Sequence, residues 1–341
     1  MIDAQPAAPA PSTAPTPSAA EAHPHRRSLP LRVGTRASPL ALVQTRDFLG
    51  TLRHFCPVLR GMDVFDEHAI RTTGDTVQDR ALAEIGGKGL FSKEIHEALA
   101  DGRVDFAVHS LKDLETVLPP NIVLACTLRR EDSRDALIMH PQAGPFDPLD
   151  PYAALPRGAV IGSASVRRQA QMLHARPDLR FTLLRGNVQR RLDRVHNGDF
   201  DATLLALAGL RRLGLALQAS VALDPAIMLP SACQGIVGVT VRESDTALRE
   251  MLAGIEDPDA LVVATAERAL LAELDGSCHT PIGGLARLLA DGSLHVEGLV
   301  ARADGSFLIR RHTTGHRSDA ARLGRDLGAQ LRMDSPRDIF V

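Results

Sequence analysis

Aromatic side chains are scarce in this sequence. It contains no tryptophan, one tyrosine and ten phenylalanines among 341 residues. Proteins that bind nucleic acid by stacking bases use aromatic platforms and an excess of positive charge. Here Lys and Arg total 39 against 41 Asp and Glu, a formal net charge of -2. The sequence therefore argues against a nucleic-acid partner, although arginines crowd between Arg129 and Arg212 and leave room for a local anion site.

Clustered cysteines and long apolar runs are also missing. The four cysteines are far apart and form no C-x-x-C pair: Cys56, Cys126, Cys233 and Cys278. We therefore expect free thiols in a reducing compartment rather than a disulfide or zinc framework. No stretch of 18 apolar residues is present, so no membrane span is expected. These features predict a cytoplasmic protein without a membrane partner.

Composition divides the chain into a leader and three regions. Residues 1–30 are rich in alanine and proline and poor in large apolar residues, so we expect a disordered leader that lacks the apolar segment of a secretory signal. The remaining length suits two or three domains. Boundaries in composition predict an α/β domain from 31–128 plus 236–250, a second α/β domain from 134–229, and a small third α/β domain from 256–341.

The stretch Ala107–Leu114, AVHSLKDL, is a short apolar run that closes with a lysine and a carboxylate. This pattern predicts an interior strand that delivers Lys112 and Asp113 at its carboxyl end. In open α/β sheets, ligands bind at that end. The alternative is that both residues simply start a helix at the surface, with Asp113 as its N-terminal charge.

Two similar segments follow predicted strands and precede predicted helices. In Gly34–Leu40, Ser38 is placed to cap a helix that has proline at its first position. Ser165 precedes Arg167 and Arg168 in the same way. The free amides of such helix starts favour anions. If two α/β units of this kind face each other across a hinge, both sets of residues line one cleft.

Two glycine-rich segments have open interpretations. Gly86–Phe91 resembles a phosphate loop only loosely, and its residues suit a mobile lid that carries Lys88 about as well as a plain turn. Asp275–Gly284 places Cys278 in a tight turn between glycines, where the thiol is either functional or incidental. The residues alone do not decide between these alternatives.

In combination, these segments resemble the porphobilinogen deaminase (hydroxymethylbilane synthase) family over nearly the whole chain after the leader. The motifs that carry the resemblance are GTRASPL at 34–40, GGKGLF at 86–91, HSLKD at 109–113, VRRQ at 166–169, LRGNV at 184–188, and GSC with PIG at 276–283. The resemblance implies three domains, two of them like periplasmic binding proteins. It also implies a monomeric transferase that joins four porphobilinogen molecules head to tail, with loss of ammonia, to give the linear tetrapyrrole hydroxymethylbilane.

The resemblance further implies roles for individual residues. Chain growth starts on a dipyrromethane cofactor held by Cys278 through a thioether, and Asp113 is the catalytic carboxylate. The carboxylates of cofactor and substrate are implied to bind a set of cations and hydroxyls: Lys112, Arg36, Ser38, Ser165, Arg167, Arg168, Arg185, Arg191, Arg212 and, on the lid, Lys88. Arginine suits this task because its planar fork binds carboxylates in pairs.

Two residues depart from the family pattern, and a second function fits the same kind of cleft. Glu115 stands where the family commonly has proline, and Glu84 where it often has lysine. The rival is a non-catalytic module that binds an anionic solute in the same kind of two-domain cleft. Such a module would explain the arginines, but it would not explain a cysteine loop together with Asp113.

Overall fold

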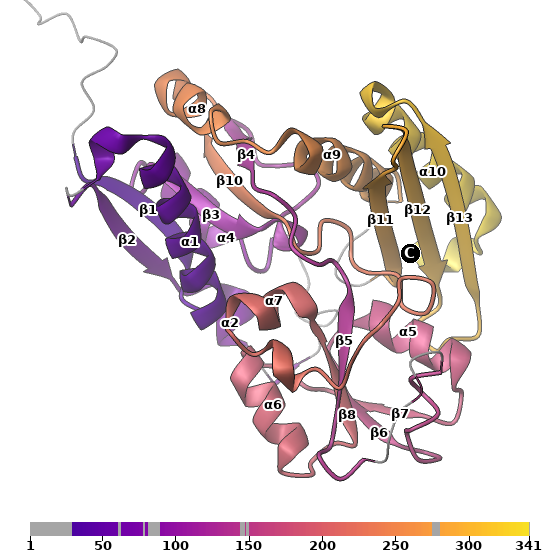
Figure 1. The fold of residues 1–341 in the computed structure, drawn as a ribbon. Helices are drawn as coiled ribbons and strands as arrows, with labels where there is room; N and C mark the ends of the chain where they lie inside the picture. The colour runs from indigo at the N-terminus through magenta and orange to yellow at the C-terminus, as the bar shows by residue number, and fades with distance from the viewer. Residues whose placement is uncertain are drawn as a thin grey trace, which may run out of the picture.

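The computed structural model describes most of the chain after the leader. The described residues are 29–60, 63–77, 79–80, 89–143, 147, 150–274 and 280–340. Their helices and strands build three units, each with its own sheet (Figure 1). Within these residues, no helix is both long enough and apolar enough to cross a membrane.

The first sheet has the strand order β2-β1-β3-β10-β4. Its strands are β1 (Leu31–Arg36), β2 (Phe65–Ile70), β3 (Phe106–Ser110), β4 (Ile122–Thr127) and β10 (Val237–Arg242). The helices of this unit are α1 (Pro39–Phe55), the short α2 (Thr73–Thr76), α4 (Lys93–Ala100) and α8 (Thr246–Ala253). Phe48 of α1 and Phe106 of β3 pack edge to face in its core, with ring centroids 5.7 Å apart.

The second sheet has the order β7-β6-β8-β5-β9. Its strands are β5 (Asp135–Met139), β6 (Val160–Gly162), β7 (Arg180–Thr182), β8 (Ala202–Ala206) and β9 (Val221–Ala222). Its helices are α5 (Val166–Ala175), α6 (Val188–His196) and α7 (Leu207–Arg212).

The two sheets repeat one arrangement. In the first, β1 pairs in parallel with β2 and β3, and β10 lies antiparallel beside β3. In the second, β6 pairs in parallel with β7 and β8, and β5 lies antiparallel beside β8. Helices α1 and α5 follow the equivalent strands β1 and β6. The expected pair of similar α/β units is therefore confirmed, and the chain passes from one to the other twice, between β4 and β5 and between β9 and β10.

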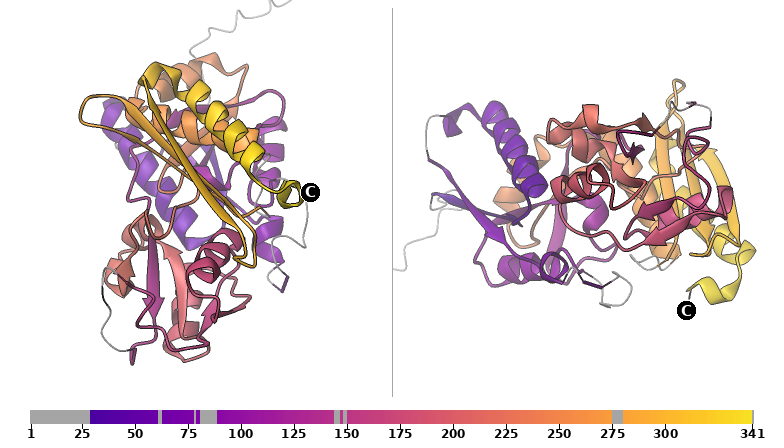
Figure 2. Two further views of the ribbon diagram at one scale, coloured as in Figure 1. Left: turned by 90° about the vertical axis from the view of Figure 1, so that its right-hand side faces the viewer. Right: turned by 90° about the horizontal axis from the view of Figure 1, so that it is seen from below.

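The third unit is a three-stranded antiparallel sheet with two helices. Its strands are β11 (Ile282–Leu288), β12 (Leu294–Ala301) and β13 (Leu308–Gly315), and its helices are α9 (Pro258–Glu273) and α10 (Ala320–Asp334). Figure 2 shows this unit, coloured from orange to yellow, beside the other two. The two helices pack closely because Gly324 of α10 faces α9, where an added Cβ would lie 2.1 Å from the carbonyl oxygen of Ala266.

Local signals in the sequence position the residues of interest. Ser38 caps α1, its Oγ accepting from the amide of Ala41 at 3.3 Å, and Pro39 is the first helical residue, as predicted. Ser165 caps α5 in the same way. Strand β3 is almost fully buried and ends at Ser110, and Leu111–Asp113 forms one short 3-10 turn. The predicted interior strand is therefore confirmed, and the alternative surface helix is not formed.

Candidate active site

A cleft of about 820 Å³ opens between the first two units. Its lining includes the starts of three helices, one from the first unit and two from the second, with Ser38, Ser165 and Asn187 as their capping residues. An N-cap hydroxyl accepts a bond from the helix and keeps its own proton for donation. Helix starts and arginines thus converge on one space, which favours anions there.

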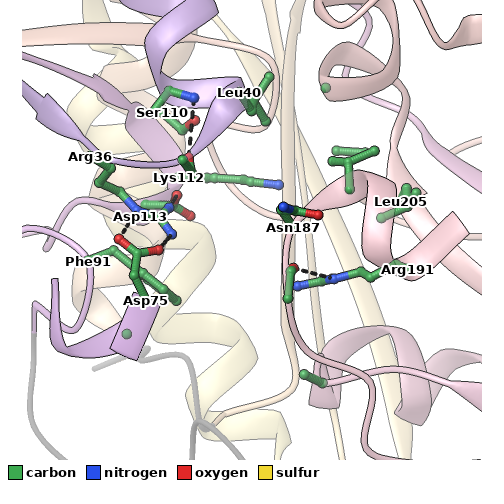
Figure 3. A pocket seen from close by; sticks show the side chains of 18 of the residues that line it. Arg36, Leu40, Asp75, Phe91, Ser110, Lys112, Asp113, Asn187, Arg191 and Leu205 are labelled. Carbon is green, nitrogen blue, oxygen red and sulfur yellow. Dashed lines mark hydrogen bonds and ion pairs between the residues drawn. The ribbon is translucent and has the colours of Figure 1, made fainter. Parts of the chain in front are cut away.

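One wall of the cleft carries a carboxylate pair around a single arginine (Figure 3). Arg36, at the end of β1, donates from Nη1 to Oδ2 of Asp113 at 3.0 Å and from Nη2 to Oδ1 of Asp75 at 2.5 Å. Its guanidinium also lies over the ring of Phe91, 4.2 Å from the centroid. Burial alone would lower the pKa of Arg36, but the charges of Asp113 and Asp75 outweigh it and raise that pKa. The arrangement fixes the position of Asp113 through Arg36.

Asp75 is a functional candidate that the sequence reasoning did not identify. Burial would raise the pKa of its carboxyl, but hydrogen bonds from Arg36 and Thr72 lower it. The Thr72 hydroxyl donates to it at 2.8 Å, so the carboxylate is held at the start of α2. The sequence did contain one indication of this role: Asp75 follows β2 closely, and β2 ends at the same sheet edge as Arg36.

The facing wall carries an arginine pair on α5. Arg167 and Arg168 are both buried and place Nη2 at 2.8 Å from opposite oxygens of Asp135, at the start of β5. Burial would raise the pKa of Asp135, but the two arginines hold it well below its usual range. Asp135 was also missed by the sequence reasoning, because the residues that explain it lie more than 30 positions further along the chain.

Two more arginines project from α6 and the loop before it. Arg191 donates from Nε to the carbonyl oxygen of Gly186 at 2.9 Å, and Figure 3 shows it on the wall opposite Arg36. Its pKa falls to about 10, because of burial and of the positive charges of Arg168, Arg185 and Arg36. Among the residues described, Arg191 has no carboxylate within ion-pair distance. Within the described part of the chain, the positive charges around Arg191 outweigh the opposing charge of Asp113.

Arg185 spans the cleft from the second unit to the first. It donates to the carbonyl oxygens of Gly74 at 2.8 Å and Arg80 at 3.0 Å. Burial lowers the pKa of Arg185 in this position. The side chain therefore ties the two walls together at the end of the cleft near α2.

Lys112 extends from the Asp113 wall toward the wall that carries Asn187 and Arg191 (Figure 3). Its Nζ donates to Oε1 of Gln234 at 3.0 Å. Burial lowers the pKa of Lys112 to about 8, although the neighbouring Asp113 acts in the opposite direction. This ammonium group is therefore charged at neutral pH and close to its titration range.

The remaining predicted residues lie elsewhere. Arg212 lies beside the hinge loop, the segment 229–236 that precedes β10, where its Nη2 donates to the carbonyl oxygen of Gly235 at 2.7 Å. Cys278 and Lys88 lie outside the described residues. Downstream of that cysteine, Thr280 and Ile282 line the cleft. The structure thus brings together Arg36, Ser38, Lys112, Asp113, Ser165, Arg167, Arg168, Arg185 and Arg191.

Two observations indicate a ligand rich in carboxylates. Arg191 lacks a carboxylate partner, as described above, and Nε of Arg168 is buried with no hydrogen-bond partner among the described groups. Buried donors are almost always satisfied in proteins, so a water or a bound molecule completes the bonding of such a group. The cleft volume lies in the range of small-molecule sites. These residues fit an elongated, multiply charged anion.

Comparison with known proteins identifies the family. A model described as "Porphobilinogen deaminase, dipyromethane cofactor binding domain" matches residues 31–250, and "Porphobilinogen deaminase, C-terminal domain" matches 261–333. The chain belongs to the porphobilinogen deaminase family. The porphobilinogen deaminase of Paracoccus denitrificans is 46% identical over 91% of this chain and 96% of that protein. The chloroplastic porphobilinogen deaminase of Oryza sativa subsp. japonica is 42% identical over 91% of this chain and 85% of that protein.

Nearly all of the cleft lining lies within the region that matches the first family model. The first matching region, 31–250, contains both walls and is the part of the family that binds the dipyrromethane cofactor. The cofactor's carboxylates suit the cations found there. Solved structures align less closely: the periplasmic VFT2 domain of Bordetella pertussis BvgS covers 69% of this chain and 92% of its own length at 15% identity, with a TM-score of 0.37.

Proposed function

We propose that this chain condenses four porphobilinogen molecules into hydroxymethylbilane, as a transferase of tetrapyrrole synthesis. The observation that carries the proposal is the position of Asp113, a carboxylate that shares one cleft with a wall of arginines. In a site that only bound anions, a carboxylate would serve to hold cations in place, as Asp135 holds Arg167 and Arg168. A reaction that develops positive charge on an anionic substrate requires cations and a carboxylate in one cleft, and the family membership favours this reaction over the solute-binding alternative.

The arginines account for recognition of the substrate. Porphobilinogen carries an acetate and a propionate, so each added unit brings two carboxylates. Among the described residues, the Nη atoms of Arg191 have no hydrogen-bond partner, whereas Arg168 is engaged with Asp135 and with a backbone carbonyl oxygen. A guanidinium binds a carboxylate through two parallel bonds. Ser38 and Ser165 add hydroxyl donors at helix starts, where the backbone amides also favour negative charge. We expect the cofactor and the substrate to be held along this wall.

Asp113 accounts for the chemical step. Loss of ammonia from porphobilinogen leaves positive charge on the pyrrole nitrogen, and a fixed carboxylate stabilises that charge. Arg36 holds Asp113 at 3.0 Å, so the carboxylate needs little rearrangement when the charge develops. Asp113 is also placed to accept the proton released when the new bond forms. Lys112, beside it, would bind a carboxylate while its ammonium group is charged.

The anchor of the cofactor is proposed to be Cys278. When bound, the dipyrromethane supplies the pyrrole to which porphobilinogen units are added. Burial raises the pKa of the Cys126 and Cys233 thiols to about 12, so both are protonated and poor nucleophiles at neutral pH. These two cysteines are therefore unsuited to form a thioether. Cys56, at the end of α1, does not line the cleft. Both points support the cysteine of the 275–284 segment.

We further propose a cytoplasmic monomer with no nucleic-acid or membrane partner. Among the described residues, exposed large apolar side chains lie on different elements; Val58 follows α1, Leu217 follows α7 and Met333 lies in the last turn of α10. Isolated apolar residues of this kind are normal on a monomer surface. Sedimentation at micromolar concentration tests this part of the proposal, which a stable dimer would contradict.

Ammonia release tests the reaction. The purified chain is incubated with porphobilinogen, and ammonia and linear tetrapyrrole are both quantified. We expect four ammonia molecules for each hydroxymethylbilane formed. Porphobilinogen that binds without ammonia release would favour the solute-binding alternative and overturn the proposal.

A further inference from the structure

Gln234 lies where the chain returns from the second unit to the first, and its side chain is fully buried. The residues on both sides have left-handed backbone conformations, with φ of 62° at Cys233 and 93° at Gly235. A non-glycine residue rarely adopts such a conformation, and strain of this kind persists only where surrounding contacts impose it. These two backbone conformations fix the direction of the Gln234 side chain between them.

The surrounding contacts come from all three units. Glu267 of α9 accepts from the amide of Cys233 at 2.5 Å, and Arg130, after β4, donates to the carbonyl oxygen of Gln234 at 2.9 Å. Arg212 of α7 donates to the carbonyl oxygen of Gly235. Gly235 itself has no room for a side chain, because an added Cβ would lie 2.3 Å from the carbonyl oxygen of Glu131, in the segment between β4 and β5.

The amide of Gln234 joins one wall of the cleft to the other. Its Oε1 accepts from Nζ of Lys112 at 3.0 Å, and its Nε2 donates to Oδ1 of Asp135 at 2.9 Å and to the carbonyl oxygen of Ser133 at 2.8 Å. An ammonium group can only donate and a carboxylate can only accept, so these partners fix which end of the amide faces which wall. Through Asp135, Gln234 also reaches Arg167 and Arg168.

We propose that Gln234 is a positioning residue that holds the Lys112 ammonium group in the cleft and sets its distance from the Asp135–arginine cluster. This rests on the proposed function only in giving Lys112 a role in binding carboxylates. An amide suits the position because it accepts from Lys112 and donates to Asp135 at once. A carboxylate would repel Asp135, and an apolar side chain would leave a buried ammonium group without an acceptor.

The test measures the pKa of Lys112 directly. The pH dependence of its acetylation by a small reagent is followed by peptide mass spectrometry, in the protein without substrate. The charged groups that face Lys112 are Asp113, Asp135, Arg167 and Arg168, and all are kept in every variant. We expect Gln234→Met to lower the pKa of Lys112 by about one unit or more, and Gln234→Glu to raise it by about one unit.

A matched control separates positioning from packing. Gln171 is another buried glutamine; its Oε1 accepts from the amide of Leu229, and it touches neither Lys112 nor Asp135. Gln171→Met should weaken the fold without moving the pKa of Lys112. In cofactor-loaded enzyme, the pKa of the alkaline limb of kcat/KM should follow the same order. It should be lowest in Gln234→Met, equal in the wild type and Gln171→Met, and highest in Gln234→Glu.

Several outcomes overturn the proposal. An unchanged pKa of Lys112 in both Gln234 variants, or a shift in the same direction in both, would reduce Gln234 to a packing residue. If Gln234→Met does not fold, the isosteric Gln234→Glu decides alone, and an unshifted or lowered pKa in it contradicts the proposal. A failure of the proposed reaction would leave the acetylation result standing, because that measurement requires no turnover.

Discussion

Arg36 is held from two sides by carboxylates, and that arrangement restricts how Asp113 can move. The Asp113 side chain is only a quarter exposed and keeps a 3.0 Å ion pair with Arg36. Among the described residues, only Arg36 forms a hydrogen bond or an ion pair with the Asp113 carboxylate, so this pair defines its orientation. The chemistry proposed for the site depends on that single fixed negative charge.

Removal of the charge should abolish most of the activity. For Asp113→Asn, which keeps the shape of the side chain, we expect kcat to fall by about 100- to 1,000-fold, since a preorganised group that stabilises developing charge is worth this much in other enzymes. The melting temperature should change little. Steady-state turnover of porphobilinogen checks this, with Asp101→Asn on the exposed surface as the control. Activity within tenfold of wild type would remove Asp113 from the mechanism.

The charge of Lys112 should appear in the pH profile. Its pKa is about 8, so the ammonium form is present below that pH and is lost above it. We expect kcat/KM to decline above about pH 8. In Lys112→Arg the guanidinium stays charged, and the decline should disappear. A profile with the same alkaline limb in both proteins would assign the limb to another group.

At the scale of helices and strands, two helical glycines differ in the space around them, and substitution of each by alanine tests the helix packing. Gly324 faces α9 so closely that a Cβ would meet a carbonyl oxygen at 2.1 Å, whereas Gly50 of α1 has nothing within 4 Å. Gly324→Ala should destabilise the fold by about 1–3 kcal/mol, as overpacking does. Gly50→Ala should stabilise it by about 0.5–1 kcal/mol through better helix propensity. Urea unfolding of both variants checks the pair, and equal effects would contradict the helix packing described here.

The elements themselves were largely predictable from sequence. The strand before Lys112, the helix starts at Ser38 and Ser165 and the repeated strand–helix pattern all follow from local signals. Asp75, Asp135 and Gln234 did not follow, because their roles come from partners distant in sequence; Gln234 lies 122 positions from Lys112 and 99 from Asp135. Only the order of strands in the two sheets brings such residues together. The domain boundaries and the roles of the site residues stay predictions.

At the scale of the whole molecule, the buried Asp135 should make the free energy of unfolding depend on pH in the acidic range. Its folded-state pKa lies far below the unfolded value of about 4, so it contributes stability above that value and loses it as the pH falls toward the folded pKa. Asp135→Asn should lower the free energy of unfolding at pH 7 by about 3–5 kcal/mol, because two buried arginines lose their partner. It should also flatten the acid dependence below about pH 4. Urea unfolding between pH 2 and pH 7 provides the measurement, and a variant with the wild-type slope would contradict the assignment.

The three units also act together at the cleft. Arg185 ties the second unit to the first, and Glu267 of the third unit holds the hinge loop that carries Gln234. The site is therefore assembled by contacts between units rather than within one. This arrangement is consistent with the family assignment, in which matching regions extend across 31–250 and 261–333.

The intact mass of the purified chain, followed by mapping of the peptide that contains Cys278, tests the central claim most directly. We predict a mass heavier than the sequence by two linked pyrrole units, located on Cys278 and absent from Cys278→Ser. An unmodified chain that also stays unmodified after incubation with porphobilinogen, or a modification located on another residue, would contradict the account.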